Sequence, residues 1–147
     1  MIDAFIIYDE KISSKNQCET LLSELRKKKK IKCDYLIIKK NFFHYLPNAL
    51  IFLVLNFISL FRSTKYKDYN LILSCGRIAA PYNLFFSKKN YTKNYHILDP
   101  YFRRGGFTKI IIPYHDHQKM KIYQNTIFTV GALSKKTNLW HIKGVQC

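Results

Sequence analysis

Acidic residues are scarce in this sequence: its 147 residues contain 9 Asp and Glu against 25 Lys and Arg, which gives a formal charge of +16. Such an excess of positive charge favours an anionic partner, whether nucleic acid, a phosphorylated ligand or an anionic membrane surface. Drift toward A/T-rich codons would enrich Lys, Asn, Ile, Tyr and Phe in the same way. Composition alone therefore leaves a binding explanation and a neutral one open.

Several common motifs are also missing. The four cysteines form no C-x-x-C pair, so neither a zinc site nor a disulfide framework is expected, and a reducing cytosol is the default compartment. No signal peptide is recognisable, because Met1 leads into a strand-like segment interrupted by Asp3 and Asp9. There is no P-loop, G-x-G-x-x-G or G-x-S-x-G. We expect a cytoplasmic protein, with peripheral contact at the inner membrane as an open alternative.

What the sequence does contain is an alternation of short apolar runs with segments of helical spacing. Strands are predicted at 4–8, 33–38, 69–73, 95–98, 109–112 and 127–130, and helices at 17–29, 45–61 and 78–89. The intervals after the fourth strand are too short for a helix in every connection. The predicted fold class is α/β, with a Rossmann-like, mostly parallel sheet flanked by helices. Residues 1–133 form the predicted domain and 134–147 a tail.

The most hydrophobic segment is 45–61, which carries no charge and is slightly shorter than the ~20 residues that a membrane-spanning helix needs. On a helical wheel its few polar residues fall on one side, opposite a broad apolar face. This pattern suits a core helix, a helix lying in a membrane interface or, less well, a true span. Flanking lysines and arginines would suit the interfacial alternative, since they could meet anionic headgroups.

Four predicted strand ends carry a polar or glycine residue that could serve a ligand. They are Asp9, Gly76-Arg77, Asp99 and His115-Asp116. In a parallel sheet these ends lie on one edge and converge there. Arg77 could clamp a phosphate or a carboxylate, and Gly76 would let the backbone approach it closely. A structural ion pair of Arg77 with Asp99 or Asp116 is the alternative.

The run His115-Asp116-His117 resembles part of a metal site, since two histidines would point to the same side of an extended segment. Without a third identifiable ligand we expect no metal there. A histidine beside a carboxylate could instead act as a general base or bind a ligand hydroxyl.

Four motifs in a fixed order resemble the elongated-mitochondria (ELM) family, named for plant mitochondrial fission proteins. They are S-C-G-R at 74–77, D-P at 99–100, P-x-H-D at 113–116 and N-x-x-x-T-x-G-A-L at 125–133. A weaker match covers 4–17, where the family has D-G-x-x-G-x-x-N-Q. Here Asp9, Asn16 and Gln17 agree with the motif, while Glu10 and Ser13 replace its glycines.

The resemblance implies the N-terminal half of a GT-B glycosyltransferase, in which two Rossmann-like domains face each other across a cleft. Bacterial members are also described as nucleoside-diphosphate-sugar epimerases. A nucleotide sugar would be a substrate, and no cofactor is implied. The second domain, or a partner chain, would hold most of the donor, so this chain is expected to be inactive alone.

The candidate ligand-binding residues combine the strand ends with the motif positions, and no catalytic residue is assigned. They are Asp9, Asn16, Gln17, Gly76, Arg77, Asp99, His115, Asp116 and Gly131. An alternative function is a non-enzymatic membrane-surface or interaction protein that uses its basic faces and the 45–61 helix. Nucleic-acid binding is disfavoured, because no recognised nucleic-acid motif accompanies the charge.

Overall fold

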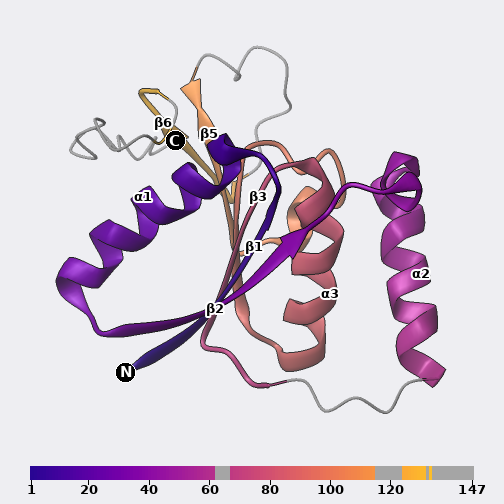
Figure 1. Ribbon diagram of the computed structural model, residues 1–147. Coiled ribbons are helices and arrows are strands. Elements are labelled where there is room, and N and C mark those ends of the chain that lie inside the picture. The colour runs from indigo at the N-terminus through magenta and orange to yellow at the C-terminus, as the bar shows by residue number, and fades with distance from the viewer. Residues whose placement is uncertain (62–66, 115–123, 132, 134–147) are drawn as a thin grey trace.

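The computed structural model describes residues 1–61, 67–114, 124–131 and 133, in which six strands form one parallel sheet (Figure 1). The strand order is β2-β1-β3-β4-β5-β6. The strands are β1 (Ile2–Asp9), β2 (Ile31–Ile38), β3 (Leu71–Cys75), β4 (Lys93–Ile97), β5 (Lys109–Pro113) and β6 (Thr126–Thr129). The helices are α1 (Ile12–Lys28), α2 (Asn48–Phe61) and α3 (Ala80–Asn90), with 3-10 turns η1 (Phe42–Tyr45), η2 (Arg77–Ala79) and η3 (Arg104–Gly106).

The central strands are apolar on both faces because helices cover both. On one face Ile6 and Leu73 pack with Cys18 and Leu22 of α1. On the other face the neighbouring residues Ile7 and Ile72 belong to a separate cluster, which includes the start of α3. This is the burial expected of parallel strands, whose runs are hydrophobic without alternation. The predicted α/β fold with a Rossmann-like parallel sheet is therefore confirmed.

Helix α2 does not lie on the sheet but packs against α3, as an outer layer (Figure 1). Only Asn48, Ile51 and Phe52 of α2 are buried. The core-helix interpretation of 45–61 therefore holds for one side of α2 and not for the other. The buried side includes a polar residue, while Phe57 and Phe61 on the expected apolar face are exposed.

The start of α1 differs from the prediction. We expected a polar loop over 10–16 and a helix from residue 17, but α1 begins at Ile12. The apolar stripe on which the prediction was based starts at Cys18, whereas the preceding turn contains Ser14, which is only 3% exposed. A small polar residue buried by a tertiary contact gives no periodic hydrophobic signal. This correction turns the expected loop into a helix N-terminus at the edge of the sheet.

The connection between β4 and β5 contains only η3 among its residues, in agreement with the expectation that some crossovers lack a full helix. Asn94 organises this connection. Its side-chain amide donates to Ser87 Oγ and to the Gly106 carbonyl, and its Oδ1 accepts from the Thr108 amide at 2.9 Å. A buried asparagine thus replaces the hydrogen bonds that a regular helix would have supplied.

Candidate functional site

A pocket of about 400 Å³ lies at the carboxyl ends of β1 and β3. In the order β2-β1-β3 the chain passes from β1 to β2 on one side and then from β2 to β3 on the other side of β1. Open α/β sheets bind ligands at such a switch point. The pocket is lined by Asp9, Glu10, Lys11, Ser13, Ser14, Lys40, Gly76, Arg77, Ile78 and Leu98. Three candidates from the sequence, Asp9, Gly76 and Arg77, are therefore brought together.

Gly76 brings the corner after β3 close to the end of β1. Its φ of +89° is a conformation that residues with side chains rarely adopt. A Cβ at this position would lie 3.4 Å from both Asp9 Oδ2 and Ser14 Oγ. The other carboxylate oxygen, Asp9 Oδ1, accepts a hydrogen bond from the Lys11 amide at 3.3 Å. The glycine thus keeps open the space into which Asp9 Oδ2 faces.

The N-terminus of α1 forms one wall of the pocket. Its N-cap, Lys11, makes no side-chain capping bond, and the first turn holds no acidic residue. The first amides of a helix have no intrahelical acceptor and carry the positive end of its dipole, so they favour an anion. The side chains of Lys11, Lys40 and Arg77 add positive charge to the same pocket, against Asp9 and Glu10.

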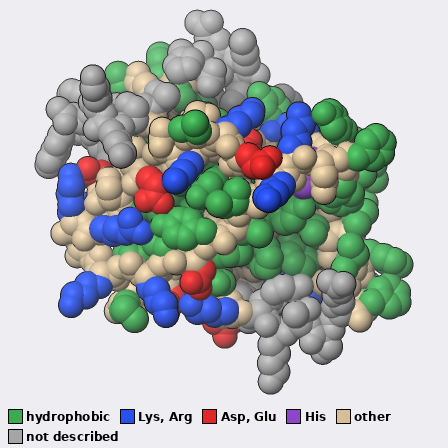
Figure 2. Space-filling model, in the orientation of Figure 1, with side chains coloured by type: hydrophobic (Ala, Val, Ile, Leu, Met, Phe, Trp, Pro, Cys, Tyr) green, Lys and Arg blue, Asp and Glu red, His purple; other side chains and the backbone are tan. Residues whose placement is uncertain are grey.

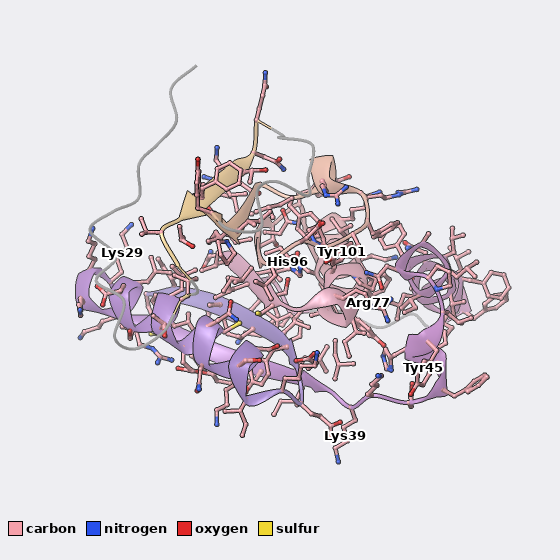
Figure 3. The ribbon with its side chains drawn as sticks, turned by 90° about the horizontal axis from the view of Figure 1, so that it is seen from above. Lys29, Lys39, Tyr45, Arg77, His96 and Tyr101 are labelled. Carbon is pink, nitrogen blue, oxygen red and sulfur yellow. The ribbon has the colours of Figure 1, made fainter. Side chains whose placement is uncertain are left out.

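Arg77 joins the pocket to η1 and α2 (Figure 3). Its Nη2 donates to the His44 carbonyl at 2.9 Å, and its backbone carbonyl accepts from Asn48 Nδ2 at 2.8 Å. Asn48 Nδ2 also donates to the Pro100 carbonyl at 3.1 Å. Burial and the Arg77 charge lower the pKa of His44, which keeps the imidazole neutral beside the guanidinium. Part of the donor fork of Arg77 is therefore used to fix the start of α2.

Asp99 does not pair with Arg77. Its carboxylate accepts two bonds from Arg104, at 2.9 Å from Nε and 2.6 Å from Nη2, and a third from the Tyr101 amide. The alternative in which Arg77 forms an ion pair with Asp99 is therefore wrong. Arg104 lies only five residues after Asp99, so a short turn brings its guanidinium to the Asp99 carboxylate. Asp116, the other expected partner of Arg77, lies outside the described residues, as does His115.

The remaining candidates do not line the pocket. Asn16 is exposed, with its carbonyl bonded to Thr20 Oγ1 within α1. Gln17, also on α1, has a buried Oε1 without a hydrogen-bond partner. Gly131 follows β6, where its carbonyl accepts a bond from Thr129 Oγ1 at 2.7 Å. These residues were predicted only because they occupy positions of the family motifs. Asn16 lies within α1, and the helix places it away from the edge of the sheet at which Asp9 lies.

Sequence reasoning missed Ser13, Ser14, Lys11, Glu10 and Lys40 as lining residues. A signal was present for two of them, because Glu10 and Ser13 occupy the positions where the family motif has glycines. Both side chains line the pocket at these positions. The side chains of Glu10 and Ser13 narrow this part of the pocket, which glycines at the same positions would leave open to a ligand.

Behind the pocket lies a buried polar network centred on His96 (Figure 3). His96 Nδ1 lies 2.7 Å from Ser74 Oγ, which also accepts from Asn83 Nδ2 at 2.6 Å. Asn83 donates a second bond to the Tyr95 carbonyl. Complete burial lowers the pKa of His96 to about 3, with Asp99 opposing the shift weakly. The network ties β3, β4 and α3 together where the Gly76 corner begins.

A second, larger pocket of about 480 Å³ lies between α1 and the sheet, away from the β1–β3 switch point. Leu21 and Leu25 of α1 face Tyr95, Ile111 and Ile127 across it, and its walls are almost wholly apolar. Among the described residues, its lining includes Lys29, Asn70, Lys93 and Thr129 but no carboxylate. The polar pocket is therefore the better candidate for chemistry.

Two further findings concern metals and membranes. Within the described ranges, no three His, Cys, Asp or Glu side chains come together as a metal site.

None of the helices in the described part of the chain is long and apolar enough to cross a bilayer. The 14 residues of α2 extend over about 21 Å, against a hydrocarbon core of about 30 Å.

Comparison with known families found a match to the family model described as Mitochondrial fission ELM1, over residues 14–143. The matched region contains most of α1, the Gly76-Arg77 corner and every strand after β1. Comparisons with curated proteins and with solved structures found no significant match.

Proposed function

Since the chain belongs to the mitochondrial fission ELM1 family, we propose that it forms one wall of a glycosyltransferase cleft. In this proposal the pocket at the carboxyl ends of β1 and β3 holds the phosphate groups of a nucleotide sugar. A second Rossmann-like domain, in the same protein or in a partner chain, faces this edge and completes the cleft. The nucleotide sugar is a substrate, and no separate cofactor is required.

The observation that carries the proposal is the convergence of anion-binding groups on one pocket. The uncapped N-terminus of α1 supplies amides, and Lys11, Lys40 and Arg77 supply cations around a volume of about 400 Å³. Backbone amides at a helix N-terminus and charged side chains together are the usual means of binding phosphate. Gly76 supports this assignment, because close backbone approach is what a phosphate site needs.

In glycosyl transfer an acceptor hydroxyl attacks the anomeric carbon, its proton leaves, and the bond to the nucleoside diphosphate breaks. Lys11, Lys40 and the α1 amides would stabilise negative charge on the departing phosphates. Asp9 Oδ2, which lies over Gly76, would accept the proton of an acceptor hydroxyl bound beside it. All of these groups come from one edge of one sheet. Positioning two reactants therefore requires the facing domain.

The phosphate assignment is tested by titrating the purified chain with uridine diphosphate and with inorganic pyrophosphate in a calorimeter at low salt. Lys11→Ala combined with Lys40→Ala should weaken binding roughly tenfold, about 1.4 kcal/mol. Lys27→Ala with Lys28→Ala, in the last turn of α1, is the matched control and should change affinity less than twofold. Equal losses in both double variants would mean that bulk charge, not the pocket, binds the ligand.

The need for a facing domain is tested separately, by incubating the chain alone with a panel of nucleotide sugars. We expect binding without hydrolysis or transfer. Turnover by the isolated chain that Asp9→Asn abolishes would contradict the two-sided cleft while leaving the pocket assignment intact. Absence of binding together with absence of turnover would instead contradict the pocket assignment.

A further inference from the structure

The outward face of α2 is an apolar surface that the fold leaves uncovered. Six large side chains on it are between 45% and 77% exposed. They are Leu50, Leu53, Phe57, Ile58, Leu60 and Phe61. Spacings of three and four residues place them along one side of the helix. Phe42 and Tyr45 of η1, 88% and 70% exposed, extend this surface beyond the start of α2.

The apolar face is as large as the largest apolar patches that soluble monomers expose, which are often functional. At about 150 Å² or more per large side chain, six of them at roughly half exposure present on the order of 500 Å². Monomers rarely expose larger contiguous apolar patches without a functional reason. Figure 2 shows hydrophobic side chains gathered over α2 at the right-hand edge of the molecule. We call this surface, formed by the six α2 side chains with Phe42 and Tyr45, the α2 face.

The surroundings of the α2 face are basic, and one cation stacks on a ring of the face itself. Lys40 Nζ lies 4.8 Å from the centre of the Tyr45 ring. Two further cations lie on the other side of α2, toward α3, where Lys88 Nζ and Arg103 Cζ lie 5.2 Å and 5.1 Å from the ring of Phe52, which is buried and is not part of the α2 face. No acidic residue occurs in the sequence between Asp34 and Asp68. The surroundings of the α2 face are therefore positively charged, and the ammonium group of Lys40 lies at the edge of its apolar surface.

We propose that the α2 face docks on the surface of an anionic phospholipid bilayer, with its rings and leucines in the acyl boundary. Long cationic side chains around an apolar helix face suit this environment, because their heads reach anionic headgroups while their stems cover apolar surface. The 14 residues of α2 are too few to span a bilayer, so the helix lies in its plane. A second copy fits less well, since a two-fold contact would bring two positively charged surfaces together.

The α2 face is rigidly connected to the phosphate-type pocket. Arg77, which lines the pocket, donates a hydrogen bond to the His44 carbonyl of η1. Asn48, at the start of α2, donates one to the Arg77 carbonyl. Lys40 belongs to both, because it lines the pocket and stacks on Tyr45. Docking of the α2 face therefore places the pocket beside the headgroups. The docking proposal itself does not depend on what the pocket binds.

The test is co-sedimentation of the full chain with vesicles of phosphatidylcholine containing 30% phosphatidylserine, and with vesicles of phosphatidylcholine alone. We expect binding to the anionic vesicles that weakens as salt is raised. The triple variant Leu53→Ser, Phe57→Ser, Phe61→Ser removes exposed side chains and should reduce the apparent affinity at least roughly tenfold. Ile37→Ser with Val130→Ser, two exposed apolar residues elsewhere, is the matched control and should bind as the unmodified chain does.

Sedimentation velocity without lipid distinguishes the rival occupants. A dimer that the triple serine variant converts to monomer, with no vesicle binding by the unmodified chain, would overturn the proposal in favour of self-association. Vesicle binding that survives the triple variant but is lost in Lys39→Ala with Lys40→Ala would show purely electrostatic adsorption and would also overturn it. Circular dichroism of each variant confirms that the fold is intact, which the exposure of the replaced side chains leads us to expect.

Discussion

Acidification from pH 7 to pH 5 should destabilise the fold through one buried imidazole, that of His96. The ring is completely buried, its Nδ1 lies 2.7 Å from Ser74 Oγ, and its Nε2 has no hydrogen-bond partner. A charge at this position would have no compensating carboxylate within the network. Burial accordingly lowers the pKa from 6.5 to about 3.

The sign and size follow from proton linkage. Between pH 6.5 and about pH 3 the unfolded chain binds a proton on His96 that the folded chain does not. The stability contribution is therefore fully present above the unfolded pKa of about 6.5 and is lost as the pH falls. At pH 5 the loss amounts to about 2 kcal/mol, a large share of the 5–15 kcal/mol typical of folded domains.

The assay is urea unfolding at pH 7 and pH 5 of the unmodified chain and of His96→Gln, an uncharged variant that can still bond to Ser74. The pH-dependent loss should be about 2 kcal/mol smaller in the variant. His44, whose pKa is also lowered, contributes equally to both proteins and cancels. Equal pH dependence in the two proteins, or an NMR titration of His96 with a midpoint near 6.5, would refute the reasoning.

Three further changes have expected outcomes. Gly76→Ala imposes a side chain on a residue with φ of +89° and should cost about 1–2 kcal/mol, measured by thermal unfolding, besides weakening pyrophosphate binding; an unchanged melting temperature would contradict this. Arg104→Ala removes two bonds from the Asp99 carboxylate, whose side chain is 10% exposed, and should cost about 2–4 kcal/mol in urea unfolding. Asp99→Asn should cost less, because the charge that remains, on Arg104, is more exposed to solvent, at 24%. Asn94→Ala removes the acceptor of the Thr108 hydroxyl and the donor to Ser87 Oγ and the Gly106 carbonyl, while the Thr108 amide keeps its bond to the Asn94 carbonyl. The variant should cost about 2–3 kcal/mol in urea unfolding; a loss below about 0.5 kcal/mol would mean that water replaces the asparagine.

Much of the fold could be predicted because its signals are local. Runs such as 4–8 and 109–112 are uniformly apolar, which is typical of parallel strands buried on both faces. The strand boundaries moved by about two residues, as they do when pairing extends a strand beyond its apolar run. The early start of α1 could not be predicted, since Ser14 is buried by a contact with the Gly76 corner that is distant in sequence.

For the candidate site, the sequence predicted which residues lie at the strand ends but not what their side chains bind. Asp9 and Gly76-Arg77 meet because neighbouring parallel strands end at one edge. The partners of their side chains could not be predicted in the same way. Arg77 bonds to the His44 carbonyl, 33 positions earlier, and nothing in the spacing of these residues indicates that contact.

The sequence by itself determined the alternation of strands and helices, the family and the corner formed by Gly76 and Arg77. The elements and the corner depend on residues within one or two turns of chain, where spacing dictates geometry, and the family follows from the order of four short motifs. Only the tertiary structure decided that Asp9 lies over Gly76, that Arg104 takes Asp99, and that the apolar side of α2 faces outward. The physical reason for the last is that Asn48 is satisfied inside, by the carbonyls of Arg77 and Pro100. A buried polar group must be bonded, and here that requirement sets the rotation of the helix and leaves its leucines and phenylalanines exposed.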